Sequence, residues 1–544
     1  MKSSTLSPIA LAYMTNSIAL LNAKIYTDWH SQPVQALIVN NGLVEHVGTN
    51  QDILNICNTS TKKHDLAGMT VWPGLCDAHI HVEQLSKQLA AVNCEGLSKQ
   101  EILQAIKQRA DQVAAGEWII GYGFNQNDWQ PPEYGTAQEL DAVSPNNPVL
   151  IHAKSLHAAW TNTMAMRLAG IHANSPDPEA GTFLRHQDGS PNGILLEYAI
   201  SSVSKHIPDA TPSQLAQDLL KTQTHLHSLG ISAVHDFDGI ASAQAFLDLA
   251  TQDKLRLRVT KLARMENFDR IISENWHKKL QAAPFLSPGW LKLFADGALG
   301  PQSAAMLEPY EKSTNRGMLL MSREEMIEIG HKASQHGWSL SIHAIGDLAA
   351  RTCLDAIEAL QKLEPHPMQN GRFPHRIEHI QALNPQDLAR FKQLGVIASV
   401  QPLHATSDYL TAERLWGKRC EHAYAYKSLL DSGAELFVGT DAPVEPANPF
   451  HTLHAAISRQ TLAGQPKPHG WYPQQALSLK ETLAAMTTNP AKYFATSAQT
   501  GMLKPGSNAD FIILKDDPFS LSVSELGRIS PEKTFIAGEE VFSK

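Results

Sequence analysis

Between residues 68 and 497, short apolar runs rich in β-branched residues alternate with longer stretches whose apolar residues recur at helical spacing. This alternation is typical of βαβ units, in which helices connect parallel strands. Eight runs are predicted as strands: 70–76, 232–235, 255–262, 290–294, 339–342, 376–378, 396–400 and 435–438. Eight such strands close a (β/α)8 barrel of the TIM type, so the predicted fold class is α/β.

Both ends of the chain show a different pattern, in which apolar and polar residues alternate over short segments between turn signals. The N-terminal part includes a hairpin signal at Asn40-Asn41-Gly42. Because the termini of a domain often lie close together, the two ends are predicted to form one small, discontinuous β-sandwich domain. The predicted divisions are 1–16 for an N-terminal tail, 17–67 and 498–544 for the β-sandwich domain, and 68–497 for the barrel.

The gap between the first two predicted strands is much longer than one helix, and residues 82–225 are predicted as a lid inserted after strand one. Long ordered insertions of this kind are usually functional. Its aromatic residues Phe124, Trp129 and Trp160 allow two interpretations. They could line a pocket for an acyl or aromatic group, or they could form the small core of the insertion itself.

Composition and charge limit the classes of partner and the cellular compartment that the sequence favours. The net charge of −9 disfavours nucleic acid and anionic membranes as partners, and no apolar run reaches the ~20 residues that span a bilayer. The five cysteines are odd in number and form no CxxC pair, which favours a reduced, cytoplasmic chain; a signal peptide is not indicated at the start. The expected partners are a small-molecule substrate and, as one option, a second copy in a homodimer.

Ligand-type residues follow several of the predicted strands. His79 and His81 alternate along one strand, so both side chains point to the same face, as a divalent ion requires. His343, His379 and Asp441 follow strands five, six and eight. A single histidine at a strand end is more often a core residue, but five ligands at the C-terminal ends of barrel strands indicate a metal site. Imidazole ligands favour zinc, with iron or manganese as alternatives.

Two further residues at strand ends are ambiguous. His235 ends strand two, where a structural or supporting role is favoured over ligation. Lys292 lies inside the apolar strand four, where an unpaired ammonium group is costly. One interpretation pairs Lys292 with Asp296 or another barrel carboxylate. In the other, burial neutralises the amine, which then adds carbon dioxide to form a carbamate that bridges two metals. The residues alone favour the ion pair.

Several motifs together resemble the amidohydrolase superfamily, in its YtcJ-like branch of metal-dependent hydrolases (amidohydrolase family 3). They are Pro73-Gly74-Leu75-Cys76-Asp77-Ala78-His79-Ile80-His81, Lys292-Leu293-Phe294-Ala295-Asp296-Gly297, Ser341-Ile342-His343-Ala344-Ile345-Gly346-Asp347, Arg376-Ile377-Glu378-His379, Gly439-Thr440-Asp441-Ala442-Pro443 and, near the end, Pro505-Gly506 and Ala509-Asp510-Phe511. The resemblance covers nearly all of the chain beyond the N-terminal tail.

The resemblance implies a role for each matched residue. His79 and His81 resemble the pair that holds the more buried of two metals, and Lys292 takes the place of a bridging, carboxylated lysine. His343 and His379 resemble ligands of the second metal. Asp441 resembles the aspartate that binds metal and carries the proton. One or two divalent ions, most simply zinc, are therefore expected.

The implied activity is hydrolysis of a C–N bond in an amide, formamide or cyclic amide, other than a peptide bond, by metal-activated hydroxide. The alternatives are deaminase or esterase activity, or a non-catalytic regulatory protein that binds a small molecule.

Two segments of the predicted lid depart from the family's usual motifs. The family usually has Gly-Trp-Gly-Trp-Asp and Asp-Gly-His where this chain has Gly121-Tyr122-Gly123-Phe124-Asn125 and Ser155-Leu156-His157, so the substrates of relatives do not transfer to it. The candidate substrate contacts are Phe124, Trp129, His157, Glu197 and His404. Glu445 and Arg459 are interpreted as a solvated or structural pair.

Overall fold

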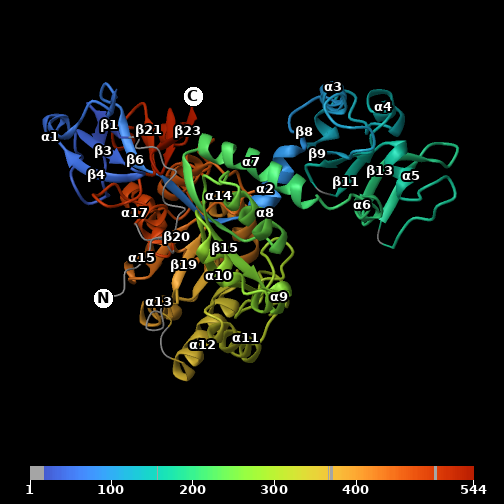
Figure 1. The fold of residues 1–544 in the computed structure, drawn as a ribbon. Coiled ribbons are helices and arrows are strands. Elements are labelled where there is room, and N and C mark those ends of the chain that lie inside the picture. Colours follow the sequence, from blue (N-terminus) through green and yellow to red (C-terminus); the bar gives the residue numbers. More distant parts are fainter. Residues whose placement is uncertain (1–16, 156, 180, 365–366, 368–371, 495–498) are drawn as a thin grey trace. The chain divides into compact units, whose positions relative to one another are not determined.

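The computed structural model describes residues 17–155, 157–179, 181–364, 367, 372–494 and 499–544 (Figure 1). The tail predicted over 1–16 lies outside these residues. Contacts divide the chain into two compact units. The barrel unit comprises residues 1–83 and 219–544, and the inserted unit comprises residues 84–218. Across the described residues, no helix combines the length and apolar character that a membrane-spanning segment requires.

The barrel unit contains an eight-stranded sheet in which every strand pairs in parallel with the next one along the chain. Its strands are β7 (Leu75–Ile80), β14 (Ile231–Asp236), β15 (Arg258–Arg264), β16 (Leu286–Phe294), β17 (Ser339–Ala344), β18 (Arg376–His379), β19 (Ile397–Val400) and β20 (Glu435–Val438). Beyond the last strand, the Asp441 amide donates to the His79 carbonyl at 2.7 Å. The sheet is nearly closed, and the predicted barrel is confirmed.

Helices follow the barrel strands and cover the outside of the barrel (Figure 1). They are α8 (Ile240–Thr251), α9 (Phe268–Ser273), α10 (Trp276–Ala282), α11 (Arg323–Gln335), α12 (Asp347–Leu363), α13 (Leu388–Gln393), α14 (Pro402–Trp416), α15 (Tyr426–Asp431), α16 (Pro449–Ser458), α17 (Leu479–Ala485) and α18 (Thr488–Ala491). In α12, buried residues such as Ala349, Cys353 and Ile357 recur at helical spacing and face the barrel.

The first predicted strand needs a correction. Residues 70–76 were expected as one strand, but the structure divides them at Gly74. Strand β6 (Thr70–Pro73) pairs with β2 and β21 in another sheet, whereas β7 begins at Leu75 in the barrel. A Cβ atom on Gly74 would lie 2.4 Å from Oγ of Ser232. The chain can therefore pass between the two sheets here only because residue 74 has no side chain.

Two smaller sheets in the barrel unit bring the chain ends together, as the blue and red strands of Figure 1 show. One contains β1 (Ile18–Leu21), β3 (Ala36–Asn40), β4 (Leu43–Gly48) and β5 (Lys62–Asp65). The other contains β2 (Lys24–Ile25), β6, β21 (Phe511–Leu514), β22 (Lys533–Ile536) and β23 (Glu539–Ser543). Helix α1 (Asn50–Ile56) packs on the first of these sheets, whereas α19 (Val523–Leu526) lies against α16. Leu37 and Phe511, from different sheets, belong to one buried cluster, so the sheets share a core.

The inserted unit has its own six-stranded mixed sheet, in the order β12-β13-β11-β10-β9-β8. Its strands are β8 (Val92–Asn93), β9 (Ile119–Phe124), β10 (Val149–Ala153), β11 (Ala158–Thr161), β12 (Gly181–Arg185) and β13 (Pro191–Glu197). Its helices are α3 (Lys99–Ala110), α4 (Ala137–Val143), α5 (Thr163–Leu168) and α6 (Ala199–Ser204), while α2 (Val82–Ala90) and α7 (Pro212–Ser228) span the boundaries with the barrel unit.

The aromatic residues of the inserted unit form its core. Phe124 and Trp129 are 1% and 5% exposed, and their ring centroids lie 5.7 Å apart. Trp160 packs against both rings, and Trp129 donates its indole N–H to the Leu97 carbonyl at 3.1 Å. Rings enclosed in this way have no free face for a ligand. The structure therefore corrects the substrate-contact prediction for Phe124 and Trp129 in favour of the core interpretation.

Candidate metal centre

The six residues predicted to bind metal lie on the C-terminal ends of the barrel strands or just beyond them. His79 lies in β7 and His81 immediately follows it, while Lys292, His343 and His379 lie in β16, β17 and β18. Asp441 follows β20 by three residues. His79, His379 and Asp441 are buried and offer ligand atoms that all lie within 4.8 Å of one another, as ligands of a shared ion would.

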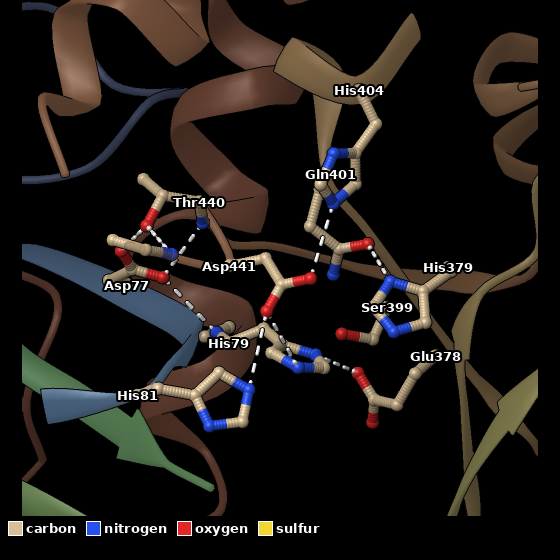
Figure 2. A network of polar contacts seen from close by, with 12 residues as sticks. Asp77, His79, His81, Glu378, His379, Ser399, Gln401, His404, Thr440 and Asp441 are labelled. Atoms are coloured by element: carbon tan, nitrogen blue, oxygen red, sulfur yellow. Dashed lines mark hydrogen bonds and ion pairs between the residues drawn. The ribbon is translucent and has the colours of Figure 1, made fainter. Parts of the chain in front are cut away.

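The carboxylate of Asp441 is the centre of this arrangement (Figure 2). Its Oδ1 atom lies 3.5 Å from Nε2 of His79 and 3.4 Å from Nε2 of His81. Its Oδ2 atom lies 3.2 Å from Nε2 of His404. Burial alone would raise the pKa of Asp441, but these imidazoles outweigh burial and hold that pKa well below its usual range. The carboxylate is therefore an anion that can hold a cation or accept a proton.

Buried carboxylates fix His79 and His81, the two histidines that face Oδ1 of Asp441. Nδ1 of His79 lies 2.7 Å from Oε2 of Glu378, and Nδ1 of His81 lies 3.2 Å from Oδ1 of Asp238. Because Glu378 is ionised and can only accept, Nδ1 of His79 carries the hydrogen; burial lowers the pKa of His79 to about 4, so its Nε2 keeps the lone pair and faces Asp441. Asp238 and Asp441 outweigh burial and raise the pKa of His81 to about 9, so both nitrogens of His81 carry a hydrogen at pH 7, and its Nε2 would release a proton on binding a metal. Such supporting partners orient metal-binding imidazoles in proteins.

The other two histidines have neutral acceptors. Nε2 of His343 donates to the Gly297 carbonyl at 2.9 Å, which leaves the lone pair on Nδ1. Nδ1 of His379 donates to Oε1 of Gln401 at 2.8 Å, which leaves the lone pair on Nε2. The two rings lie 4.7 Å apart. Burial lowers the pKa of His343 to about 3 and that of His379 well below its usual value, so both are neutral at pH 7, as metal ligation requires.

Two of these residues have an unusual backbone. His379 has a φ of 73° and Asp441 a φ of 62°. Residues other than glycine seldom adopt this left-handed conformation, and such strain is concentrated at functional sites. In this barrel it occurs where the chain leaves β18 and just beyond β20, so the strain lies at the proposed ligands.

Lys292 is 3% exposed, and its Nζ atom lies 4.9 Å and 4.8 Å from the ring centroids of Phe237 and Phe294. Within the described ranges its amine makes no hydrogen bond or ion pair. The carboxylate of Asp296, its expected partner, instead accepts the backbone N–H groups of Ala305, Ile345 and Gly346. The ion-pair interpretation is therefore wrong.

The environment of Lys292 fits the carbamate interpretation. Burial lowers the pKa of its amine to about 8, although nearby carboxylates oppose the shift. Part of the Lys292 amine is therefore neutral near pH 7, and the neutral amine is the form that adds carbon dioxide. The residues present thus fit a bridged metal centre: three neutral imidazoles with a free lone pair, the His81 imidazole that would release a proton on ligation, one anionic carboxylate, and one buried amine that has no polar partner among the described residues.

The supporting residues Glu378, Asp238 and Gln401 were assigned no role from the sequence. Glu378 is also held by Ser341 Oγ at 2.6 Å and by the Arg376 guanidinium, whose Nη1 lies 3.0 Å from Nδ1 of His235. This contact gives His235 a structural position, as favoured. A carboxylate beside an arginine within a strand predicted for the barrel, as at Glu378 in Arg376–His379, is the sequence signal that indicates such a support, because a buried charge needs a partner.

The remaining candidates lie in separate places. Nδ1 of His404, on α14, lies 3.6 Å from Oε1 of Glu445. Arg459 instead donates to the Trp471 and Tyr424 carbonyls, so the expected Glu445–Arg459 pair is wrong. In the inserted unit, Nδ1 of His157 lies 2.9 Å from Oε2 of Glu197, and both side chains are exposed. A substrate contact by either residue stays a prediction.

Comparison with known proteins decides the family. A model of the Amidohydrolase family matches residues 63–542. The chain belongs to the amidohydrolase family. It is 30% identical over 526 residues to the YtcJ protein of Bacillus subtilis (strain 168), across 94% of this chain and 96% of that protein. The resemblance inferred from the motifs is thus confirmed.

Two further relatives bear on the activity. The N-substituted formamide deformylase of Arthrobacter pascens is 26% identical over 545 residues, which covers 96% of this amidohydrolase and 97% of the deformylase. The crystal structure of an uncharacterized metal-dependent hydrolase from Pyrococcus furiosus superimposes with a TM-score of 0.76 at 28% identity, over 93% of this chain and 100% of that one. The family and its solved relatives support a metal-dependent hydrolase.

Proposed function

We propose that this amidohydrolase cleaves a C–N bond of a small amide, formamide or cyclic amide, other than a peptide bond, in the cytoplasm. One observation carries the proposal. Four imidazoles at the strand ends each place one nitrogen against a protein acceptor, and Nε2 of His79 and of His81 faces the anionic Asp441. The similarity to a formamide deformylase supports the class of bond.

The donor set suits one or two divalent ions. His79, His81 and Asp441 would hold one ion, and His343 and His379 a second. A carbamate on Lys292 would supply an oxygen to each. Neutral imidazoles with carboxylate oxygens favour zinc, with iron and manganese as alternatives.

A bound ion would supply hydroxide at neutral pH and polarise the substrate carbonyl. The protein's own contribution to proton transfer comes from Asp441. Its Oδ1 accepts the proton of the attacking water and returns it to the leaving nitrogen, first as general base and then as general acid. Nε2 of His404 lies 3.2 Å from Oδ2 of Asp441 and fixes the orientation of that carboxylate. His404 is also positioned to contact the substrate.

The rest of the chain supports this site in the proposal. The two small sheets that share a core form a β-sandwich domain, and the exposed His157 and Glu197 of the inserted unit remain candidate substrate contacts. The strands that carry the ligands are held by the barrel, so the site is rigid where the chemistry requires fixed geometry.

The test begins with metal analysis of the purified protein. The parent is expected to contain transition metal, and the double variant His79→Ala, His81→Ala to lose most of it. His331→Ala, which removes an exposed histidine on α11, is the matched control and should keep its metal. The metal-loaded parent is then screened against N-formyl and N-acyl amides, with esters and amidines as probes of esterase and deaminase activity. Equal metal in parent and double variant would contradict the centre, and metal without turnover on any amide would contradict the activity.

A further inference from the structure

One large apolar side chain is exposed beside the candidate metal centre. Phe294 is the last residue of β16 and is 41% exposed. Successive side chains alternate between the faces of a strand, so Phe294 lies on the same face as Lys292, two residues earlier. Its ring centroid lies 4.8 Å from Nζ of Lys292 and 5.3 Å from the ring of His343. A group attached to a carbonyl at the centre would therefore be within reach of this ring.

The neighbouring loop extends the apolar surface. Leu319 forms a bridge with Asp296, and the Leu320 amide donates to the Ala295 carbonyl at 2.8 Å, so this loop lies against the end of β16. Met318 and Leu320 are 60% and 57% exposed, and Leu319 is also exposed. We call Phe294, Met318, Leu319 and Leu320 the β16 patch. The four exposed apolar side chains come from two neighbouring segments, and an exposed apolar patch on a protein surface often marks a binding site.

Charged groups nearby do not favour an ionic substituent at this patch. Arg264, the last residue of β15, is in register with Lys292 and so lies next to it at the barrel mouth. Its Nε atom is 2.8 Å from Oε1 of Glu266, so its charge is already balanced. Phe124 and Trp129, the aromatic residues first considered for apolar recognition, are enclosed in the core of the inserted unit. The β16 patch is therefore the apolar surface that could contact a substrate next to the candidate metal centre.

We infer that the β16 patch selects the substrate: Phe294 seats an uncharged alkyl or aryl substituent adjacent to the scissile C–N bond. The inference rests on the proposed function and narrows it to amides with an apolar group beside that bond. Phe294 is thus a specificity-determining residue, because it contacts the substituent and transfers no proton. Hydrophobic pockets discriminate through such contacts by roughly 10- to 200-fold for each methylene-sized difference.

The experiment compares three formamides of similar length and their acetamide counterparts. They are N-butylformamide, N-formyl-β-alanine and N-(2-aminoethyl)formamide, which are neutral, anionic and cationic at pH 7. The metal-loaded parent should have the highest kcat/KM on the butyl compound. Phe294→Ala should lower that value by about 10-fold and change the values for the charged compounds by less than about twofold. Phe294→Leu, which preserves apolar bulk, should give an intermediate loss.

Controls separate this inference from the proposed function. Leu363→Ala removes an exposed apolar side chain at the end of α12 and should leave all three values unchanged. Turnover of no amide by the metal-loaded parent would contradict the proposed function, and this inference with it. Equal turnover of charged and butyl amides, or an equal loss on all three in both Phe294 variants, would overturn the inference alone. In that case the amidohydrolase activity would stand.

Discussion

Nδ1 of His79 lies 2.7 Å from Oε2 of Glu378, although 299 residues separate them in the chain. Both side chains are buried, and the Arg376 guanidinium holds the same carboxylate. Burial alone would raise the pKa of Glu378, but Arg376 and His79 outweigh it, so the group is ionised. One carboxylate thus orients a proposed metal ligand and neutralises a buried cation.

Glu378→Gln is expected to destabilise the protein. The substitution leaves the Arg376 guanidinium buried without its counter-charge, which costs about 3–5 kcal/mol when one partner of a buried pair is removed. Urea unfolding with a chelator present measures the loss without a metal contribution. Glu324→Gln is the control: it breaks an exposed pair with Arg323 on α11, where at most about 1 kcal/mol is expected. Equal losses in the two variants would contradict the role of Glu378.

Lys292 is expected to carry a carbamate. Native mass spectrometry of the folded protein should show the added mass of one carbon dioxide, which disappears on unfolding, since its buried amine makes no polar contact with the described residues. Lys292→Ala should lower metal content, and short-chain carboxylic acids should partly restore activity. A metal-loaded structure with an unmodified ammonium group at this position would exclude the bridge.

Asp441→Asn tests the proton transfer. Asparagine keeps the size and one oxygen of the side chain but cannot accept the proton from water. The variant should therefore retain appreciable metal, while turnover per bound metal falls by a factor of about 10² to 10⁴. If Asp441 only binds metal, activity will follow metal content and reloading will restore it. The deciding quantity is turnover divided by metal measured in the same sample.

Asp28 predicts a pH dependence of stability. Burial opposes ionisation, but Lys504 at 2.6 Å and the N–H groups of Ser31 and His30 outweigh it and hold the pKa of Asp28 below its usual value. As the pH is lowered, the Asp28 carboxylate binds a proton near pH 4 in the unfolded chain but only at lower pH in the folded protein. The stabilisation by Asp28 is therefore present above about pH 4 and is lost as the pH falls below it. In urea unfolding, Asp28→Asn should be less stable than the parent at pH 7. The difference should shrink below about pH 4, and a constant difference would contradict the prediction.

Much of this amidohydrolase could be predicted from local patterns in its sequence. The barrel strands followed from apolar runs separated by helical stretches, because the repeated βαβ unit leaves a periodic signal. The hairpin at Asn41-Gly42 formed as expected, with φ angles of 50° and 78° that suit these two residues. The candidate ligands His79, His81, His343, His379 and Asp441 could be proposed because strand ends in a barrel meet at one mouth.

Contacts between distant residues were decided only by the tertiary structure. Burial and pairing depend on which strands become neighbours, so the sequence left Lys292 between an ion pair and a carbamate, and Phe124 and Trp129 between a substrate pocket and the core of the insertion. The division of residues 70–76 at Gly74 depends on Ser232, which approaches from a strand more than 150 residues away. Similarly, Glu378 can orient the His79 ring only because the fold places β7 and β18 in the same barrel. A sequence records which residues can ligate, whereas the fold fixes which nitrogen of each imidazole stays free to do so.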